Sequence, residues 1–425
     1  MTDTSDVSPA DRLYRIVEEG LCIGCGMCQT AVPPGRIDVC RTPENELRPV
    51  AGETLTHEDM DTVYEICPSM VVRGMEAERI APDTKIDGVW GPWRRAMRMH
   101  ASDPEIRHEG STAGVLTALG IYLLESGEVP FLFHVKASDR HPTFGEAHIS
   151  RTRDDVIAAA GSRYGPTAML TEFGKALDLN EPFAFIGKPC DIAAAKNFGR
   201  RDPRVGDQVK YWLTLVCGAF MPSHGTRDFL VERGHTFEAV ERMRYRGRGC
   251  PGPTTIETAA GVADYTYLDL WGDGKDGWVM PWRCKICPDG IGEAADVAAS
   301  DTWPGGTPTP EMSKADPGTN AVIARTVAGQ ELVEAAVEAG YLTLQWDVTP
   351  DEMSHYQMHQ MQKKYYVWPR HQALADEGYL VPQTYDLRIE ELAAQLPDHV
   401  NARQREGTRQ RLRAGRSREP RPVRA

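Results

Sequence analysis

The residues best suited to chemistry in this chain are its cysteines, and the densest group is the heptad CIGCGMC, which begins at Cys22. Cys22, Cys25 and Cys28 are separated by two residues each, a spacing typical of thiolates that hold a 4Fe–4S cluster. Gly24 and Gly26 let backbone N–H groups approach the sulfurs. Structural zinc sites usually use two separated CxxC pairs, so the third cysteine favours iron and sulfide over zinc.

The fourth thiolate of this site must come from elsewhere in the chain. In bacterial ferredoxins the outlying cysteine precedes a proline, and the segment EICPS supplies Cys67 followed by Pro68. Cys40 competes for the same role, but an arginine follows it. We favour Cys67 and therefore predict a first cluster held by Cys22, Cys25, Cys28 and Cys67.

A second group of cysteines lies further along the chain. Cys284 and Cys287 form a CxxC pair in WRCKICPDG, which alone fits zinc, a redox-active dithiol or half of a cluster. Cys190 in IGKPCD and Cys250 in GRGCPG occupy glycine- and proline-rich turns, where ligands are often placed. Cys217 lies in the apolar segment YWLTLVCGAF and is most simply a small buried hydrophobe. We predict a second 4Fe–4S cluster at Cys190, Cys250, Cys284 and Cys287, with a redox dithiol as the main alternative.

The elements that would position these cysteines follow from hydrophobic patterning. Residues 1–80 lack long apolar periodicity, which predicts a small ferredoxin-like module folded around its cluster, and a linker rich in Pro, Gly and Trp follows it. Beyond it, apolar strands alternate with helices, which predicts an α/β (α+β) region with a mixed sheet. We expect a strand at 94–103, a helix at 111–127, a buried strand at 129–138, a strand, turn and helix over 182–199, a strand at 211–220, a helix at 224–234, and a strand, helix and strand over 319–348.

This patterning divides the chain into four parts. After the module at 1–80, we expect a catalytic region at 81–350 that is split near residue 170, then a helical segment at 351–400 and a tail at 401–425. The tail contains nine arginines, two glutamates and almost no apolar residues, which predicts a disordered, solvated segment. The alternative is an electrostatic patch for an acidic partner such as a ferredoxin.

Composition excludes several classes of function. The chain has 425 residues and a net charge of −13, which argues against nucleic acid as the main partner. No stretch approaches the roughly 18 consecutive apolar residues of a membrane span. The first residues also lack the basic and apolar regions of a secretory signal, so we expect a cytoplasmic protein. Ten cysteines in that compartment indicate metal or redox chemistry more than disulfides.

Six segments follow one another along the chain: CIGCGMC, EGSTAGVLTAL, GSRYGPT, FIGKPCDIAAAKN, RYRGRGCPGP and CKICPDGIGEAADVAASD. Together, and in this order, they resemble the beta subunits of coenzyme F420-reducing hydrogenases and formate dehydrogenases, the FrhB/FdhB family. The same superfamily includes 7-hydroxymethyl chlorophyll a reductase and ferredoxin-dependent divinyl chlorophyllide reductase. The resemblance implies FAD as the central redox group, fed by one or two clusters, since a flavin exchanges single electrons with clusters and a hydride with organic acceptors.

The resemblance also implies residues that contact the flavin or the substrate. EGSTAGV offers N–H groups and hydroxyls at a helix start for a pyrophosphate, although an ordinary Ser/Thr N-cap is the alternative. GSRYGPT offers a charge and a stacking ring, and RYRGRG offers arginines for phosphate or carboxylate groups. Lys188, Tyr164 and His134 are the candidate catalytic residues. The cofactor-binding residues implied are Gly110, Ser111, Thr112, Ala113, Gly114, Ser162, Arg163, Tyr164, Lys188 and Arg246.

Two positions depart from the family's pattern. Lys188 stands where the family often has threonine, and its charge would favour a reduced, anionic flavin. Many members have tryptophan where Cys250 stands, so a second cluster need not be general in the family. The chain also lacks a GxGxxG fingerprint after a strand, which argues against a conventional NAD-linked dehydrogenase.

We therefore expect an iron–sulfur flavoprotein oxidoreductase. Electrons would pass between a ferredoxin or a hydrogenase/dehydrogenase partner subunit and an organic acceptor such as coenzyme F420. A ferredoxin-dependent reductase of a tetrapyrrole or another conjugated small molecule is one alternative. Another is a non-catalytic electron-transfer subunit of a larger hydrogenase or dehydrogenase complex. A homo-oligomer is compatible with the sequence.

Overall fold

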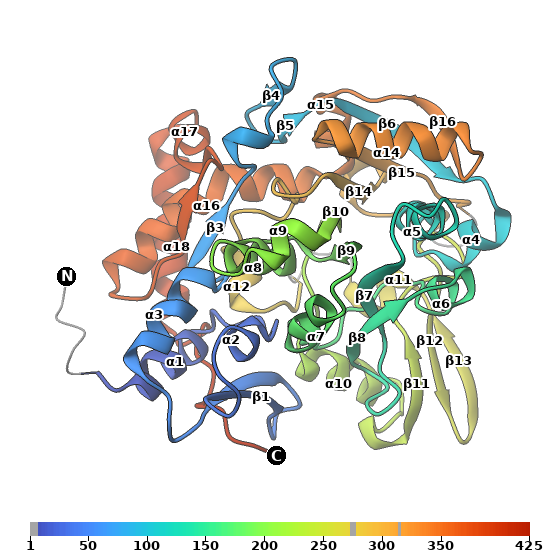
Figure 1. Ribbon diagram of the computed structural model, residues 1–425. Helices are drawn as coiled ribbons and strands as arrows, with labels where there is room; N and C mark the ends of the chain where they lie inside the picture. The colour runs from blue at the N-terminus through green and yellow to red at the C-terminus, as the bar shows by residue number, and fades with distance from the viewer. Residues whose placement is uncertain (1–6, 273–277, 313–315) are drawn as a thin grey trace.

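The computed structural model of the chain describes residues 7–272, 278–312 and 316–425, and its centre is a mixed eight-stranded sheet (Figure 1). The strand order is β16–β6–β15–β14–β10–β9–β7–β8. Strands β14, β10, β9 and β7 are parallel neighbours, whereas the outer pairs are antiparallel. The strands are β6 (Arg95–Ala101), β7 (Phe131–Ala137), β8 (Gly145–Ser150), β9 (Phe183–Gly187), β10 (Val209–Leu215), β14 (Val297–Asp301), β15 (Asn320–Ala324) and β16 (Leu342–Asp347).

Alternating side chains of the strands build a hydrophobic core on each face of the sheet. Phe131 and Phe133 of β7 point to one face, while Leu132 between them belongs to the core on the other face. Helices α7 (Phe173–Asp178) and α8 (Pro189–Gly199) cover the phenylalanine face. The opposite face is covered by α5 (Val115–Glu125) and α14 (Val327–Glu338). The predicted α/β class with a mixed sheet is thereby confirmed.

Smaller elements surround the sheet. A three-stranded antiparallel sheet contains β11 (Val240–Arg244), β12 (Thr254–Thr258) and β13 (Gly261–Tyr265). It shares a core with two short helices, α10 (Ser223–Glu232) and α11 (Tyr267–Trp271). The remaining short elements are α4 (Pro104–Glu109), α6 (Arg153–Ala158), α9 (Arg204–Gln208), α12 (Trp282–Lys285) and the hairpin of β4 (Lys85–Asp87) and β5 (Gly91–Trp93).

The N-terminal residues form three helices, a hairpin and a short strand, but their core is not their own. Leu13, Ile16 and Met60 pack in one cluster with Trp282 and Leu374 from distant parts of the chain. The short strand also pairs in parallel with β17 (Gln383–Tyr385). Residues 7–80 are therefore packed into the rest of the protein. Their elements are α1 (Pro9–Glu18), α2 (Met27–Thr30), β1 (Ile37–Arg41), β2 (Leu47–Ala51), α3 (His57–Ile66) and β3 (Val71–Arg73).

The C-terminal segment is ordered, so the prediction of a disordered tail at 401–425 was wrong. Helix α18 (Asp398–Arg413) packs on α16 (Met358–Asp376). Its arginines form ion pairs with acidic residues at the end of α16, and the sequence did not indicate these pairs because the partners are far apart in it. Residues 414–425, which we call the strap, cross to the N-terminal module, as Figure 1 shows beside β1. The other C-terminal helices are α15 (Pro350–Tyr356) and α17 (Ile389–Ala394).

Two further sequence predictions differ from the structure. The expected boundary near residue 170 does not divide the fold, because one sheet takes strands from both sides of it. Strand β10 ends at Leu215 rather than reaching residue 220. Strands β8 and β14 and the sheet of β11–β13 were not predicted. Within the described ranges, no helix combines the length and apolar character needed to cross a bilayer.

Candidate functional site

The structure brings four of the N-terminal cysteines to one small cavity of about 30 Å³. The backbone N–H of Gly24 donates to Cys22 Sγ at 3.4 Å. Gly24 has a positive φ of 69°, and a Cβ there would lie only 2.5 Å from Leu47 O, so glycine is required at this position. Cys40 instead lies on β1, where its thiol faces Arg48 O at 3.9 Å. The cysteines that line the cavity are Cys22, Cys25, Cys28 and Cys67.

A second small cavity collects another four cysteines, and one of them differs from our prediction. Cys190 begins α8 directly after β9, and Cys217 follows the end of β10. Because β9 and β10 are parallel neighbours, both thiols lie at the same edge of the sheet. Cys284 and Cys287 come from α12 and the turn after it. The lining cysteines are Cys190, Cys217, Cys284 and Cys287.

Cys250 lies apart from this second cysteine cavity, so the predicted set of four is not brought together. Its backbone bridges to Asp316, and its thiol lies near Asp301 and Arg246. Burial raises the pKa of the Cys250 thiol to about 12, and Asp301 adds to the shift. The turn-like sequence GRGCPG therefore marks a buried structural thiol. The position that we had assigned to Cys250 is taken by Cys217.

Cys25 is buried, and the other seven cysteines of the two cavities are partly buried. Burial raises the pKa of Cys22 to about 11 and that of Cys217 to about 12, so both are neutral without a bound cation. Bound iron ionises such thiols, which is why cluster sites tolerate buried sulfur. Over the described residues, no three His, Cys, Asp or Glu side chains converge to hold a single metal ion.

A third and larger cavity, of about 340 Å³, opens at the carboxyl ends of the parallel strands. It is bordered by Gly187 at the end of β9, by Cys217 beyond β10 and by Asp301 at the end of β14. Of the predicted cofactor-binding and catalytic residues, only Ala113 lies outside the lining, where it is fully buried. The predicted residues that line it are Gly110, Ser111, Thr112, Gly114, His134, Ser162, Arg163, Tyr164, Lys188 and Arg246.

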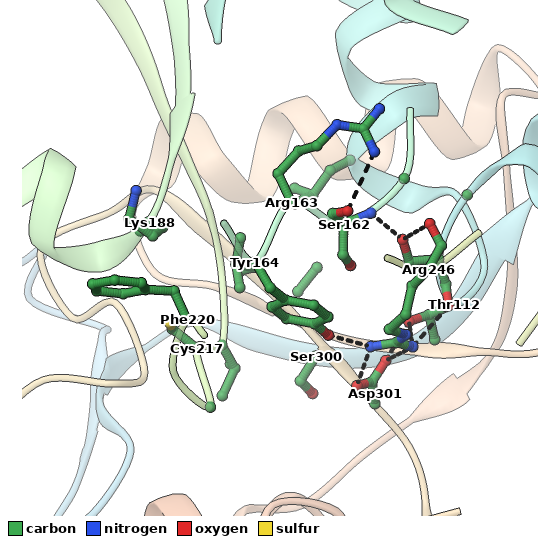
Figure 2. Close-up of a pocket in the computed structure, with 18 of the residues that line it drawn as sticks. Thr112, Ser162, Arg163, Tyr164, Lys188, Cys217, Phe220, Arg246, Ser300 and Asp301 are labelled. Atoms are coloured by element: carbon green, nitrogen blue, oxygen red, sulfur yellow. Dashed lines mark hydrogen bonds and ion pairs between the residues drawn. The ribbon is translucent and has the colours of Figure 1, made fainter. Parts of the chain in front are cut away.

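Arg246 is held inside the protein by a network on one side of this cavity (Figure 2). Its guanidinium donates to Asp301 at 3.1 Å and 3.2 Å, and to Tyr164 Oη at 3.2 Å. Thr112 Oγ1 also donates to Asp301, and Arg246 donates to the carbonyl of Ser111 at 2.7 Å. Arg246 is 4% exposed. Its charge is therefore neutralised internally, and its role here is to fix the loops.

The start of helix α5 faces the cavity without a side-chain cap. Gly114 precedes it in a left-handed conformation, and no side chain caps the first turn, so the Ser/Thr N-cap alternative was wrong. The hydroxyl of Ser111 accepts from the N–H of Ser162 at 2.5 Å instead. Val115 lines the cavity at the beginning of the helix. Free N–H groups at this end carry the positive end of the helix dipole.

Arg163 differs from the other cations that line the cavity. Its guanidinium makes weak hydrogen bonds to the carbonyls of Ser162 at 3.3 Å and Ala160 at 3.4 Å, and its buried Nε has no hydrogen-bond partner among the described residues. Burial and the nearby Arg244 lower the pKa of Arg163 to about 10. No carboxylate pairs with it in the part of the chain that the structure describes. An anionic ligand would remove this electrostatic penalty.

The predicted catalytic residues have distinct surroundings. Lys188 Nζ pairs with buried Asp191 at 2.7 Å; burial opposes its charge, but Asp191 outweighs burial and raises the pKa of Lys188. His134 bonds to Ser150 Oγ at 2.7 Å, and burial and His148 lower the pKa of His134 to about 3. His134 is therefore neutral near pH 7 and holds no proton to donate as imidazolium. Figure 2 shows Lys188, Cys217 and Phe220 across the cavity from Arg246 and Asp301.

We did not identify from the sequence the aromatic residues that line the large cavity, nor which residues this cavity shares with the second cysteine cavity. Tyr267, Trp271 and Trp303 line the large cavity, and Arg246 lies over the Trp303 ring at 4.9 Å. Gly218 also lines it, and a Cβ there would meet nothing within 4 Å, so a side chain would project into open space. Gly218 and Trp303 come shortly after the ends of β10 and β14, which was the signal available in the sequence, whereas Tyr267 and Trp271 belong to α11.

The three cavities lie in series. Ile23 lines both cysteine cavities, so the first adjoins the second. The second cysteine cavity and the large cavity share several lining residues. Cys217 is one of them: it is among the four cysteines of the second cavity and also lines the large one. The residues common to these two are Lys188, Cys217, Gly218, Ala219 and Phe220.

Comparison with known families decides what kind of protein has this arrangement. The profile for the N-terminal part of the coenzyme F420 hydrogenase/dehydrogenase beta subunit matches residues 96–173, and the profile for its C terminus matches residues 180–348. The chain belongs to this family. The resemblance drawn from the sequence is thus confirmed. The two profiles meet near the boundary that we predicted at residue 170, although this beta subunit family member forms one sheet across it.

Curated relatives of the family member include beta subunits from methanogens. The coenzyme F420 hydrogenase subunit beta of Methanothermobacter thermautotrophicus is 26% identical over 260 residues, covering 59% of this chain and 84% of the relative. The F420-dependent formate dehydrogenase 1 subunit beta of Methanococcus maripaludis is 31% identical over 29% of this chain and 32% of the relative. A chain of the F420-reducing [NiFe] hydrogenase complex from Methanosarcina barkeri has the same fold, with a TM-score of 0.51 and 20% identity over 66% of this chain and 92% of that chain.

Proposed function

We propose that the protein is an iron–sulfur flavoprotein oxidoreductase that moves electrons between an electron-carrying protein or partner subunit and an organic two-electron carrier such as coenzyme F420. The observation that carries the proposal is the series of three cavities, in which Cys217 borders both the second cysteine cavity and the large one. The names of the curated relatives, an F420 hydrogenase subunit and an F420-dependent formate dehydrogenase subunit, support coenzyme F420 as the acceptor.

The donor sets of the two cysteine cavities suit 4Fe–4S clusters. Each cavity is lined by four thiols, and all-thiolate ligation is the rule for cubane clusters. The N–H of Gly24 already donates to Cys22 Sγ, a contact that stabilises a thiolate bound to iron. We assign the first cluster to Cys22, Cys25, Cys28 and Cys67, and the second to Cys190, Cys217, Cys284 and Cys287.

The large cavity suits FAD. Its volume falls in the range of ligand pockets, and it lies at the carboxyl ends of parallel strands, where open sheets bind their ligands. Arg163, which lacks a carboxylate partner among the described residues, and the uncapped start of α5 would hold the pyrophosphate. When bound, the flavin supplies the conversion between one-electron and hydride chemistry.

The chain's own residues would control charge and water around the reacting ring. Lys188 keeps a positive charge at the border with the second cysteine cavity because Asp191 stabilises its Nζ proton. Tyr164 Oη accepts a hydrogen bond from Arg246, so its own proton is free to point into the cavity. Phe220 and Trp271 exclude water from the walls. Of the three predicted catalytic residues, Lys188 and Tyr164 are the better candidates, since His134 is neutral and tied to Ser150.

The proposal is tested on protein purified without oxygen. Iron, sulfide and flavin are quantified, and two clusters require about eight irons per chain with one FAD. The reduced protein is then mixed with coenzyme F420, whose absorbance is followed. Protein without flavin or iron after anaerobic reconstitution would refute the proposal. Loaded protein that reduces a tetrapyrrole and not F420 would favour the alternative, and isolation only with a large catalytic partner would favour an electron-transfer subunit.

A further inference from the structure

The arginines of α18 and the strap fall into two groups. The first group is neutralised within the chain: Arg405 and Arg413 pair with Asp376 and Glu377 of α16, and Arg421 in the strap pairs with Glu18. These residues therefore offer little charge to a partner. Most of the arginines in α18 and the strap form ion pairs within the chain and stabilise the fold.

The second group, Arg411 and Arg416, lies beside Lys285 of α12 and Arg370 of α16. We call these four cations, which have no carboxylate partner among the described residues, the basic patch. Arg370 Nη1 donates to the carbonyl of Lys285 at 2.6 Å, which fixes α16 against α12. The N–H of Arg416 donates to the carbonyl of Arg411 at 3.0 Å, so these two lie together at the end of α18. Among the described residues, none of the four has a carboxylate within 4.0 Å.

The charges of the basic patch repel one another. Lys285 lies close enough to Arg411, Arg416 and Arg370 for their charges to repel it. Burial and Arg411 lower the pKa of Arg370 to about 10. Lys285, Arg411 and Arg416 are nonetheless exposed, so their mutually repelling positive charges face the solvent. An approaching anionic surface would relieve it, and charge of one sign gathered in this way accelerates encounter with the opposite sign.

The location of the basic patch connects it to the proposed electron path. Lys285 stands between Cys284 and Cys287, two of the four thiols in the second cysteine cavity. Lys363 of α16 also borders that cavity, and its Nζ donates to the carbonyl of Gly218 at 3.2 Å. A protein docked on the basic patch would therefore contact Lys285 in the α12 turn that carries these thiols.

We propose that the basic patch is the docking surface for a small acidic protein that carries a one-electron centre. The inference rests on the proposed function, because it requires an acceptor behind Cys284 and Cys287. On docking, the carrier's reduced centre would lose one electron, and a cluster held by Cys190, Cys217, Cys284 and Cys287 would gain it. Nucleic acid fits less well, since the chain as a whole carries −13 and the patch is small and local.

The test compares two double variants of the full, cluster-loaded chain. R411E/R416E reverses two exposed charges of the basic patch, and R140E/R242E reverses two exposed arginines of the β7–β8 loop and β11 as the matched control. Binding of an oxidised plant-type 2Fe–2S ferredoxin is titrated by calorimetry at low and high salt. We expect the patch variant to bind at least about tenfold more weakly at low salt, with little remaining salt dependence. The control should bind as the unchanged protein does.

Two further measurements separate this inference from the proposed function. Iron and flavin contents, and the rate of reduction by dithionite, should be the same in all three proteins, because dithionite needs no docking surface. If dithionite reduces the chain but the ferredoxin binds the patch variant as tightly as the unchanged protein, the docking inference is overturned and the proposed function stands. Equal affinity of the unchanged protein for duplex DNA or anionic vesicles would also overturn it. Loss of iron or flavin from the unchanged protein would count against the proposed function, and with it the inference.

Discussion

Replacing Cys217 by alanine tests the assignment of the second cluster directly, because the chain offers Cys250 as an internal control. Cys217 lines the second cysteine cavity with Cys190, whereas Cys250 lies beside Asp301. Both thiols have pKa values raised to about 12 by burial, so the two substitutions remove similar groups. Only the location of the removed sulfur differs.

The expected magnitude follows from the ligand count. Removing one of four thiolates from a cubane site should lose that cluster, which lowers the iron content from about eight to about four per chain. Cys250→Ala should keep about eight. Each substitution removes one buried sulfur, which costs about 1 kcal/mol of folding free energy. Flavin content should be unchanged in both variants, since alanine keeps the Cβ at the border of the large cavity.

The assay is iron and sulfide quantification on anaerobically purified protein, with electron paramagnetic resonance of the reduced state as a second readout. The spectrum of Cys217→Ala should retain the signal of the first cluster alone. Our reasoning would be refuted if Cys250→Ala lost four irons while Cys217→Ala kept eight. Iron loss in neither variant would also refute a second cluster at this cavity.

Three other predictions follow from the same geometry. Arg163→Met should weaken flavin binding about 10–100-fold by removing charge-assisted hydrogen bonds worth about 1.5–3 kcal/mol, as a fluorescence titration would detect; unchanged affinity would remove Arg163 from the pyrophosphate site. Glu419→Gln should cost about 1–3 kcal/mol in urea unfolding, since Arg48 is 4% exposed and depends on this partner; an unchanged unfolding midpoint would contradict that. His134 binds a proton more readily in the unfolded chain than in the folded protein, where its pKa is lowered to about 3. The free energy of unfolding should therefore fall by up to about 1.4 kcal/mol per pH unit as the pH drops from about 6.5 towards 3. His134→Gln should remove that slope from unfolding curves measured between about pH 7 and 5.

Local patterns were sufficient to predict most of the fold and the first cysteine group. The strand at β7 and the helix at α5 follow from apolar runs that end at turn residues. Cys67 was found because a proline follows it in the manner of ferredoxins. Short, mixed segments such as β8 and the β11–β13 sheet carried no comparable signal, since their pairing depends on neighbours distant in the sequence.

The second cysteine group required information that the sequence conceals. The apolar run around Cys217 indicated a strand reaching residue 220, but β10 ends at Leu215 and leaves the thiol in the loop beyond it. Only the parallel pairing of β9 and β10 places Cys217 beside Cys190. The tail was misjudged for a related reason. Its arginines find their partners on α16, a helix with no local relation to them in sequence.

The strap has a consequence for the order in which the protein is built. Arg48 and Glu419 are 371 positions apart, so their ion pair closes one of the longest loops in the chain. During synthesis the ribosome completes Cys22 to Cys67 hundreds of residues before Glu419 exists. Docking of the strap on the N-terminal module, through Arg48 and Glu419, is therefore a late folding step.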